Sequence, residues 1–495
     1  MPDSLSEAQI GAATSKNPEY LFVDLDGTLV RTDVFVEAIL KLIKKNPLNI
    51  FRLILWGLKG RAVLKSRVAR TAKLDPHFLP YEAEMVDYIK EQKAQGRKII
   101  LATASHWTYA KRIAAHLGLF DGVMASSAKK NLKGRRKLAE IQDSLGGAPF
   151  AYAGDSPADR PIWDAAASAV HVNARAADVK STQSRNACEK VISTRKSIFA
   201  AFIKEMRLHQ WAKNVLVFVP LLTAHSYLNM GSLLQACLAF LCFSLCASGV
   251  YFLNDLLDLE ADRQHTRKRF RPLASGDLPI FSGLMGAVGL PVTAFVIAGL
   301  TLPMAFFGVL GIYYLITNLY SFFLKRVSTA DVMTLAVLYT MRVVAGGAAT
   351  GIVLSSWLMA FSVFIFVSLA YLKRYIEVSA LSQDKTTAAG RGYAVSDSET
   401  MFGLGIANTT AAVLVLALYI NSDDVAGLYA SPQILWLLCF LLLYWTNRIW
   451  IGARRGKIAD DPVVFAIKDN VSRLVGVCFL MVVLAAKFIP IEGVM

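Results

Sequence analysis

Apolar residues are spread unevenly along the chain, and their spacing divides it into two parts. Up to about residue 192, apolar and polar residues are mixed as in a globular domain. Beyond Leu216 the chain is a series of apolar runs of about 20 residues, the length that an α-helix needs to cross a bilayer. The runs lie near residues 215–230, 232–253, 281–301, 303–323, 330–350, 355–372, 401–420, 432–450 and 474–490. This pattern predicts a soluble domain followed by an all-α membrane domain of about nine helices.

Lysine and arginine are concentrated in alternate segments between the apolar runs, whereas residues 421–431 carry Asp423 and Asp424 and no Lys or Arg. Because basic loops stay on the cytoplasmic side, nine spans from a cytoplasmic start place the C-terminus outside. The first 19 residues are polar and lack the apolar core of a signal peptide. We therefore expect an integral protein of a bacterial inner membrane, with its N-terminal domain in the cytoplasm.

We attribute the net charge of +16 to these basic loops and to basic side chains that bind phosphate. The charge therefore does not predict a nucleic-acid partner. Six cysteines form no CxxC pair, and five of them lie within apolar segments. This distribution favours core thiols over a zinc site or a disulfide framework.

Acidic residues follow two strand patterns of the soluble part. The pattern YLFVDLDGTL at residues 20–29 ends in a glycine turn that leaves Asp24 and Asp26 beyond the strand. The strand at residues 150–153 runs into GDSPAD, which contains Asp155 and Asp159. Because open α/β sheets bind ligands at the carboxyl ends of their strands, these side chains predict a site there.

A hydroxyl and a lysine complete the pattern. A strand at residues 98–102 ends at Thr103, with Ser105 as a competing hydroxyl, and Lys133 lies at the start of a basic helix. With the aspartates, these four motifs in order resemble the haloacid dehalogenase (HAD) superfamily of phosphohydrolases over residues 20–175. The resemblance implies a Rossmann-like α/β fold with a small helical cap at about residues 33–92.

The HAD resemblance also implies a role for each residue. Asp24 would be the nucleophile and Asp26 the general acid and base. Thr103 and Lys133 would bind the phosphoryl oxygens. Asp155 would complete a Mg²⁺ site with Asp24, supported by Asp159.

The expected cap is basic and amphipathic. Its cations stand beside large apolar residues, at Lys41, Lys44, Lys45, Arg52, Lys59, Arg61, Lys65 and Arg67. Such helices often lie on anionic membranes. A cap that packs on its own domain and exposes a solvated basic face is an equal alternative.

An acidic and basic segment, YFLNDLLDLEADRQHTRKRFRPLASG, follows the second apolar run at residues 251–276. Asp255, Asp258 and Asp262 are spaced i, i+3, i+7, which places three carboxylates on one face of a helix, with Asn254 beside them. Carboxylates at the end of a membrane helix usually mark a functional cavity, and such oxygen ligands suit Mg²⁺ with substrate phosphates. Lys268 and Arg271 follow as phosphate donors.

This segment resembles the first signature of the UbiA superfamily of intramembrane prenyltransferases. Members that use aromatic acceptors carry a second Asp-rich element, where this chain reads YLKRYIE from Tyr371 to Glu377. The replacement removes metal ligands and supplies Lys373 and Arg374, which would bind phosphate. Glu377 and Tyr375 would support the site.

Further elements resemble the decaprenyl-phosphate phosphoribosyltransferase branch over residues 205–475. They include Lys213 in QWxKN, Arg342 in LYxxR and Asp461 in DPV. The resemblance implies transfer of phosphoribose from phosphoribosyl diphosphate (PRPP) to a polyprenyl phosphate, with Lys213 at the phosphates and Arg342 in support. Asp255 and Asp258 would be the catalytic acids.

We therefore expect a bifunctional membrane enzyme with both sites on the cytoplasmic side. The expected parts are a tail at 1–19, a HAD domain at 20–190, a linker at 191–210 and a membrane transferase at 211–495. The HAD domain would remove a phosphate, in our hypothesis the 5-phosphate of the lipid product. The alternatives are an aromatic prenyltransferase and a membrane scaffold with a regulatory HAD-like domain. The sequence leaves the oligomeric state open.

Overall fold

The computed structural model of the chain describes residues 18–127, 130–185, 187–380, 392–458 and 461–490. These residues form two compact units. The first unit comprises Met1–Glu205 with Phe252–Gly286, and the second comprises Met206–Tyr251 with Ala287–Met495.

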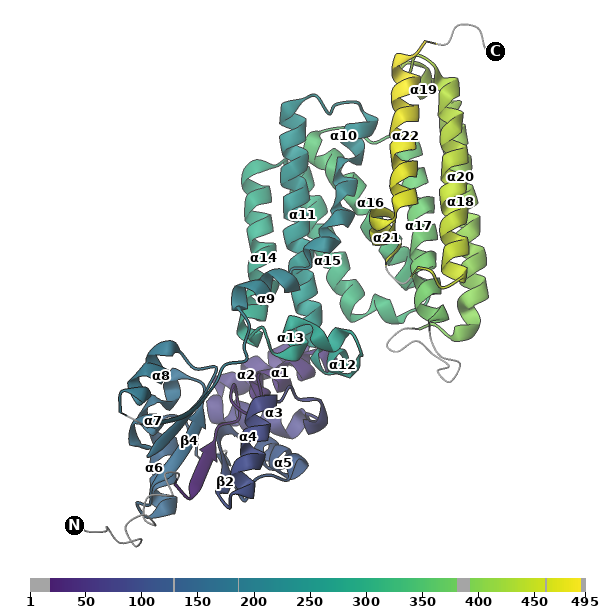
Figure 1. Cartoon of the computed structure of the whole chain (residues 1–495). Coiled ribbons are helices and arrows are strands. Elements are labelled where there is room, and N and C mark those ends of the chain that lie inside the picture. The colour runs from purple at the N-terminus through teal and green to yellow at the C-terminus, as the bar shows by residue number, and fades with distance from the viewer. Residues whose placement is uncertain (1–17, 128–129, 186, 381–391, 459–460, 491–495) are drawn as a thin grey trace, which may run out of the picture. The chain divides into compact units, whose positions relative to one another are not determined.

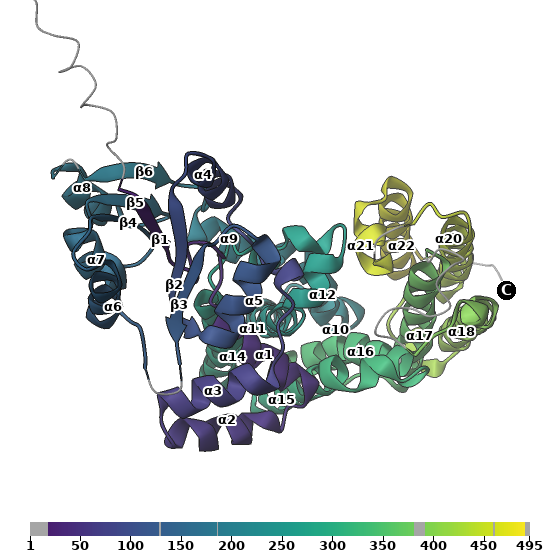
Figure 2. The ribbon, with the colours of Figure 1, turned by 90° about the horizontal axis from the view of Figure 1, so that it is seen from below.

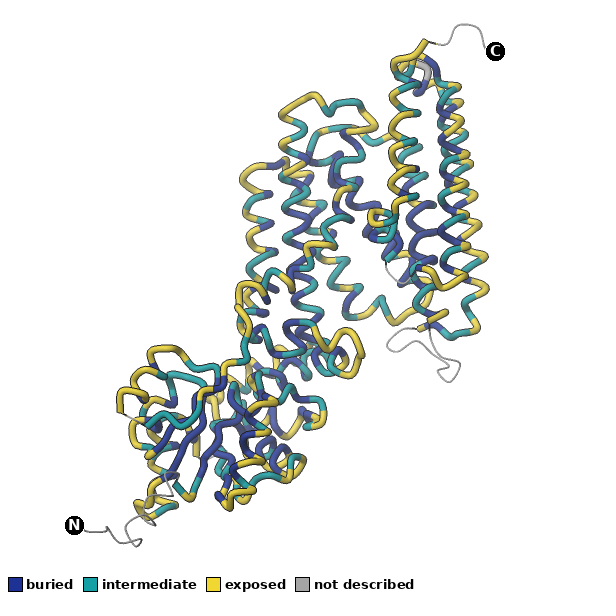
Figure 3. Tube along the Cα trace, viewed as in Figure 1, coloured by how far each residue is buried: buried dark blue, intermediate teal, exposed yellow. Residues whose placement is uncertain are grey.

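A six-stranded parallel sheet forms the centre of the first unit (Figure 1). Its strands are β1 (Tyr20–Val23), β2 (Lys98–His106), β3 (Gly122–Ser126), β4 (Phe150–Gly154), β5 (Ser168–Val172) and β6 (Cys188–Ile192). The order β3-β2-β1-β4-β5-β6 places the first strand at the centre, between β2 and β4. Strands β4 and β5 are buried along their whole length (Figure 3), and the sequence predicted β4 as a strand at residues 150–153.

Helices cover the sheet and build the cap. Between β1 and β2 lie α1 (Val34–Lys45), α2 (Asn49–Leu58), α3 (Arg61–Thr71), η2 (Pro76–Phe78) and α4 (Ala83–Ala94). The others are α5 (Trp107–Leu117), α6 (Arg135–Leu145), η3 (Pro157–Asp159), α7 (Arg160–Ala165), α8 (Ala176–Gln183) and α9 (Ile198–Glu205). The expected helical insertion is therefore present, although α4 packs on β2 as a crossover helix of the α/β core.

Within the described residues, eight helices are long and apolar enough to cross a membrane. They are α11 (Met230–Leu257), α14 (Ile280–Thr301), α15 (Met304–Phe322), α16 (Ala330–Thr350), α17 (Ser356–Ser379), α18 (Ser398–Ile420), α20 (Trp436–Arg454) and α22 (Asn470–Phe488). Short helices connect them: α12 (Leu259–Gln264), η5 (Lys268–Phe270), α13 (Pro272–Ser275), η6 (Leu324–Arg326), η7 (Val395–Asp397), α19 (Asp423–Ala426), η8 (Pro432–Leu435) and α21 (Pro462–Lys468). Eight of the nine predicted runs thus form long helices.

The first predicted run, 215–230, does not form a long α-helix. The chain forms a 3₁₀-helix, η4 (Leu208–Phe218), followed by the short α10 (Val219–Thr223). Pro220 has no N–H to donate to residue 216, so an α-helix cannot continue through it undisturbed. Arg207 and His225, both with positive φ, bound the segment at its two ends.

Helix η4 packs closely on α16 because of one glycine. A side chain at Gly346 would place its Cβ 2.0 Å from the carbonyl oxygen of Val217. Because Gly346 has no side chain, the backbones of η4 and α16 can approach each other this closely.

We predict that Gly346→Ala destabilises the second unit by roughly 1–3 kcal/mol, since the added methyl group has no room. Thermal unfolding of the detergent-purified protein measures the effect. Gly308→Ala on α15 is the matched control, because open space surrounds that position. Equal unfolding temperatures for the two variants would contradict the close contact.

Candidate active sites

The carboxyl ends of three neighbouring strands meet at a pocket of about 250 Å³ in the first unit. Asp24 follows β1, Asp155 follows β4, and Ser105 lies near the end of β2. All three line the pocket together with Asp26 and Asp159. The strand order thus brings together the acids that the sequence predicted.

Position 27 requires glycine because the carboxylate of Asp155 lies very close to its backbone. Gly27 has φ +82°, and a Cβ there would lie 2.2 Å from Oδ2 of Asp155. Any side chain at this position would collide with the carboxylate, so the DxDGT turn and Asp155 depend on each other.

Lys137 lies at the centre of the acidic group. It is buried, and its Nζ is 3.0 Å from Oδ1 of Asp24 and 3.7 Å from Oδ1 of Asp159. It also donates to the hydroxyl of Tyr152 (2.7 Å), which in turn donates to Asp159 (2.8 Å). Ser156 donates to Asp159 through its backbone N and its Oγ. Asp159 is therefore held by three other side chains.

Sequence reasoning missed Lys137. It stands four residues after Lys133, which precedes α6, and had the predicted basic helix begun at Lys133, this spacing would have placed both lysines on one face. Lys133 itself lines the pocket, as does Lys65 of the cap, which donates to the carbonyl oxygen of Ala104 (3.0 Å).

The hydroxyl position differs from the expectation. Thr103 is fully buried, is not among the residues that line the pocket, and accepts a hydrogen bond from the backbone N of Ser105 (2.9 Å). Ser105 donates instead to Oδ2 of Asp26 (2.6 Å). The reason is that β2 continues to His106, with an irregular register after Thr103. The geometry therefore favours Ser105 as the phosphate-facing hydroxyl.

The pocket carboxyls hold protons unusually well. Burial raises the pKa of Asp24 to about 6 and that of Asp26 to about 7, the latter helped by nearby Asp33. Burial and the Asp24 charge raise the pKa of Asp155 to about 8. At neutral pH, Asp26 can therefore donate a proton, while Lys137 lowers the pKa of Asp24 and favours its ionised form.

The pocket has the donor set of a cation site. One oxygen each from Asp24, Asp155 and Asp159 can be chosen so that all lie within 4.8 Å of one another. Like charges this close raise each other's pKa, and a divalent cation would relieve that repulsion. These residues thus fit Mg²⁺, as the sequence predicted.

The Asp-rich segment that begins in the last turn of α11 also lies in the first unit. Arg271 joins two of its acids, with Nη1 3.0 Å from Oδ1 of Asp255 and 2.6 Å from Oδ2 of Asp262. Burial raises the pKa of Asp262. Arg271, predicted as a phosphate donor, thus neutralises the predicted metal ligands in this structure, whereas Lys268 is exposed.

The third acid of that segment has a different partner. Helix α11 ends at Leu257, so Asp258 occupies the N-cap of α12. Its Oδ1 lies 2.8 Å from Nζ of Lys44 on α1. The structure therefore brings together two of the three predicted carboxylates. Asn254 joins the same segment through its carbonyl oxygen, which accepts from the backbone N of Asp258 (2.9 Å).

Two lysines share one acid in the second unit. Oδ2 of Asp461 lies 2.7 Å from Nζ of Lys213 and 2.9 Å from Nζ of Lys373. The hydroxyl of Tyr339 donates to the same carboxylate (3.3 Å). Burial alone would raise the pKa of Asp461, but Lys373 and Lys213 hold it well below its usual range. Two cations around one anion leave a positive site, which suits a phosphate.

Arg374 does not face a ligand site in this structure. It is fully buried, pairs through Nε and Nη2 with Asp331, and also contacts Glu377 (2.5 Å) and the hydroxyl of Tyr320 (2.8 Å). In this structure its partners are therefore carboxylates and a hydroxyl, and binding a phosphate would require Arg374 to leave them. Arg374 and Asp331 form an ion pair that joins α17 to α16, and Glu377 pairs with Arg374 within α17.

The remaining predicted residues support the helix packing. Arg342 donates to Oδ1 of Asn214 (2.8 Å) and lies over the rings of Tyr313 and Tyr339. Tyr375 is buried against Phe402 and Trp450. Neither Arg342 nor Tyr375 is one of the two cations that pair with Asp461, which are Lys213 and Lys373.

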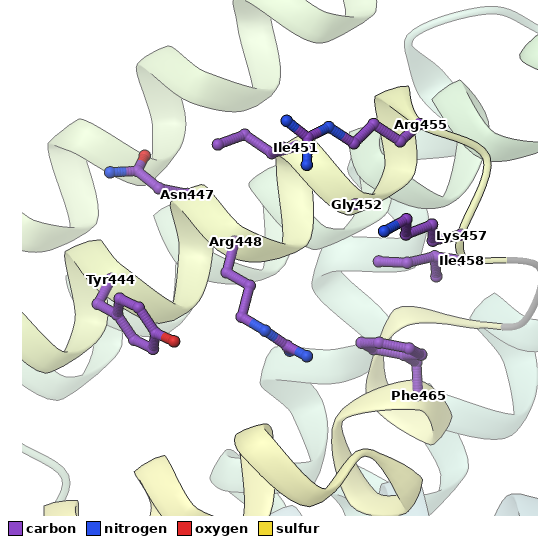
Figure 4. Close-up of a pocket in the computed structure, with 9 residues that line it drawn as sticks. All are labelled: Tyr444, Asn447, Arg448, Ile451, Gly452, Arg455, Lys457, Ile458 and Phe465. Carbon is purple, nitrogen blue, oxygen red and sulfur yellow. The ribbon is translucent and has the colours of Figure 1, made fainter.

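A second pocket, of about 450 Å³, lies beside α20 in the second unit. Figure 4 shows Arg448, Arg455 and Lys457 around it, with Tyr444 and Phe465 at its two ends. Both Nη atoms of Arg448 pair with Asp469. The residues that line this second pocket include none of the side chains that the sequence predicted for either reaction.

Comparison with known proteins connects both units to families. A family model described as the UbiA prenyltransferase family matches residues 215–468. A model described as haloacid dehalogenase-like hydrolase matches residues 21–163. The two matches leave residues 1–20, 164–214 and 469–495 uncovered.

Individual proteins agree with this division. A protein of Sinorhizobium fredii named "Uncharacterized protein y4nM" is 38% identical over 459 residues, which cover 92% of this chain and 89% of the relative. Decaprenyl-phosphate phosphoribosyltransferase of Mycobacterium tuberculosis is 31% identical over 298 residues, covering 59% of this chain and 95% of the relative. A solved UbiA homologue from Archaeoglobus fulgidus, bound to DMAPP and Mg²⁺, is 13% identical with a TM-score of 0.43, covering 58% of this chain and 99% of that protein.

The eight apolar helices and the family match make the protein an integral membrane protein. Its transferase part is related to the decaprenyl-phosphate phosphoribosyltransferases. The chain belongs to the UbiA prenyltransferase family and carries a haloacid dehalogenase-like hydrolase domain before its membrane helices.

Proposed function

We propose that the protein transfers 5-phosphoribose from PRPP to a polyprenyl phosphate and then removes the 5-phosphate of the lipid product. The observation that carries the first step is the similarity to a decaprenyl-phosphate phosphoribosyltransferase along 95% of that relative. The positive cluster of Lys213, Lys373 and Asp461 supports it, because PRPP is rich in phosphate. The acid pocket beside β1 supports the second step.

In the transfer step, a phosphate oxygen of the lipid attacks C1 of PRPP, the bond from C1 to the diphosphate breaks, and diphosphate leaves. The nucleophile is already ionised at neutral pH, so the protein needs no general base. Lys213 and Lys373 bind substrate phosphate and neutralise its charge. Asp255 and Asp262 would hold Mg²⁺, and Asp258 would join them after leaving Lys44. The ion would assist the departure of diphosphate. Arg271 then exchanges its carboxylate partners for phosphate.

In the hydrolysis step, the Asp24 carboxylate attacks phosphorus and Asp26 protonates the leaving oxygen of the sugar. Asp26, now ionised, takes a proton from water, and the water oxygen attacks the aspartyl phosphate. Inorganic phosphate leaves and Asp24 is restored. Lys137, Lys133 and Ser105 contact the phosphoryl oxygens. Mg²⁺ held by Asp24, Asp155 and Asp159 would supply positive charge for the entering phosphate.

The chemical order explains why the two activities share one chain. The transferase product still carries a phosphate on ribose C5, which is a substrate for a phosphomonoesterase. We place both sites on the cytoplasmic side, so a tethered phosphatase would meet this product at high effective concentration.

The raised pKa values of the pocket predict a pH-dependent stability. A folded acid with a raised pKa binds more protons than the unfolded chain, so the free energy of unfolding falls as pH rises towards the folded pKa. Without metal, the unfolding temperature of the hydrolase domain should fall between about pH 4 and about pH 8, because the pKa values of Asp24 and Asp155 rise from 3.8 to about 6 and about 8 on folding. Added Mg²⁺ should raise it more at the higher pH.

Differential scanning fluorimetry in chelator and in Mg²⁺ measures both effects. Asp155→Asn should weaken the pH dependence of the unfolding temperature, because it removes one of the titrating carboxyls. It should also weaken the effect of Mg²⁺ on that temperature, because it removes one proposed metal ligand. An unchanged Mg²⁺ response in that variant would remove Asp155 from the metal site.

The nucleophile can be tested by the product that accumulates. Asp24→Asn should leave transfer intact and abolish hydrolysis, because the amide cannot form the aspartyl phosphate. Incubated with PRPP and polyprenyl phosphate, this variant should accumulate the 5-phosphorylated lipid, while the wild type yields the form with one phosphoryl group less. Mass spectrometry of the extracted lipid separates the two. The same product from both proteins would mean that the hydrolase acts on another substrate.

The two basic residues of α17 should behave differently. Lys373→Ala should lower kcat/KM for PRPP roughly 10- to 100-fold, the loss of a charge-assisted phosphate contact of about 1.5–3 kcal/mol. Arg374→Ala should instead lower the unfolding temperature, since it leaves Asp331 buried without its partner. Kinetics and thermal unfolding of both variants separate the roles. Prenylation of an aromatic acceptor by the wild type, with no use of PRPP, would replace this proposal with an aromatic prenyltransferase.

A further inference from the structure

Helix α2 presents an apolar face to the outside of the first unit. Phe51, Ile54, Leu55 and Leu58 are spaced i, i+3, i+4, i+7, so they share one face, and each is more than half exposed. Phe51 is 62% exposed and Leu58 is 80% exposed. A contiguous exposed apolar face on a soluble domain indicates a binding surface.

The opposite face of α2 already packs on the domain. Leu53 is buried in the core, and the ring of Trp56 lies beneath the guanidinium of Arg67 on α3 (5.8 Å). Helices α2 and α3 lie side by side (Figure 2). The packing of Leu53 and Trp56 against the domain therefore keeps the apolar face of α2 turned outward.

The neighbouring cap helices do not offer such a face. Helix α1 directs Val34, Ala38 and Leu42 into the core, and α3 does the same with Val68 and Ala69. The sequence predicted a basic amphipathic surface across the cap, and the structure confines its exposed apolar part to α2 and the preceding Leu48.

Charge indicates an anionic partner. Residues 38–74 contain ten Lys or Arg and no Asp or Glu. Arg52 and Lys59 lie seven residues apart at one edge of the apolar face, and Arg61 follows it; all three are exposed. A second copy of this face would bring like charges together, so an anionic surface fits better than self-association.

The same unit also contains the ends of two membrane helices. The segment between α11 and α14 is tied to the cap by ion pairs, Arg263 to Glu37 at 2.6 Å and Asp258 to Lys44 at 2.8 Å. Glu37 lies on α1, whose carbonyl oxygen at Leu42 accepts from the side chain of Asn49 at the start of α2. A loop that joins two membrane spans lies at the bilayer surface, so α2 is connected to that surface through α1.

We propose that α2 is a membrane-surface helix: Phe51, Ile54, Leu55 and Leu58 insert among acyl chains, and Arg52, Lys59 and Arg61 contact the phosphates of anionic lipids. The helix would hold the hydrolase domain at the bilayer. It takes no part in either reaction, so its failure leaves the proposed function untouched.

The test uses the full-length protein in lipid nanodiscs containing phosphatidylglycerol and phosphatidylcholine. The photocrosslinking residue p-benzoylphenylalanine replaces Phe51 in one variant and Leu55 in a second. The matched control replaces Trp107, an aromatic residue at the start of α5 that is 49% exposed. Hydrolysis of a soluble phosphomonoester at the wild-type rate shows that each variant is folded.

After illumination, intact-mass measurement should show several times more phospholipid adduct at residues 51 and 55 than at residue 107. Arg52→Glu with Lys59→Glu should reduce that adduct severalfold, as should nanodiscs of phosphatidylcholine alone. Adducts at residue 51 no more frequent than at residue 107 would overturn the proposal. So would cross-links to a second protein chain in place of lipid, which would make α2 a dimer contact.

Discussion

Charged side chains removed from water must be paired, and this constraint shapes both units. An ionised group inside a protein is costly unless an opposite charge and hydrogen bonds compensate it. Lys137 does this for Asp24, the lysine pair does it for Asp461, and Arg374 does it for Asp331. Each of these cations therefore already has a carboxylate partner in this structure.

The two sites differ in the sign of their excess charge. Five aspartates and three lysines line the hydrolase pocket, which therefore needs additional positive charge before a phosphate can enter. The Asp461 cluster has two lysines for one acid and accepts an anion directly. This contrast in charge supports the proposed Mg²⁺ site among the aspartates of the hydrolase pocket.

The sequence predicted features that depend on local chemistry and failed where tertiary packing decides. Asp24 and Asp155 were found because they follow apolar strands, and the long helices were found from the length of their apolar runs. Lys373 and Arg374 are adjacent in the sequence, but one helical step of about 100° directs one to Asp461 and the other to Asp331. Lys137 looked like one more cation of a basic helix, because only the sheet brings Asp24 to it. No sequence pattern marks the irregular end of β2, which places Ser105 rather than Thr103 at the pocket.

The unusual winding of η4 affects how far the chain reaches. A 3₁₀-helix rises about 2.0 Å per residue and an α-helix about 1.5 Å, so η4 and α10 together extend over about 30 Å. An ordinary α-helix needs about 20 residues to cover that distance, which is the thickness of the hydrocarbon layer. The 16 residues from Leu208 to Thr223 therefore match the membrane in length. A ninth crossing built this way would leave the two ends of the chain on opposite sides of the bilayer.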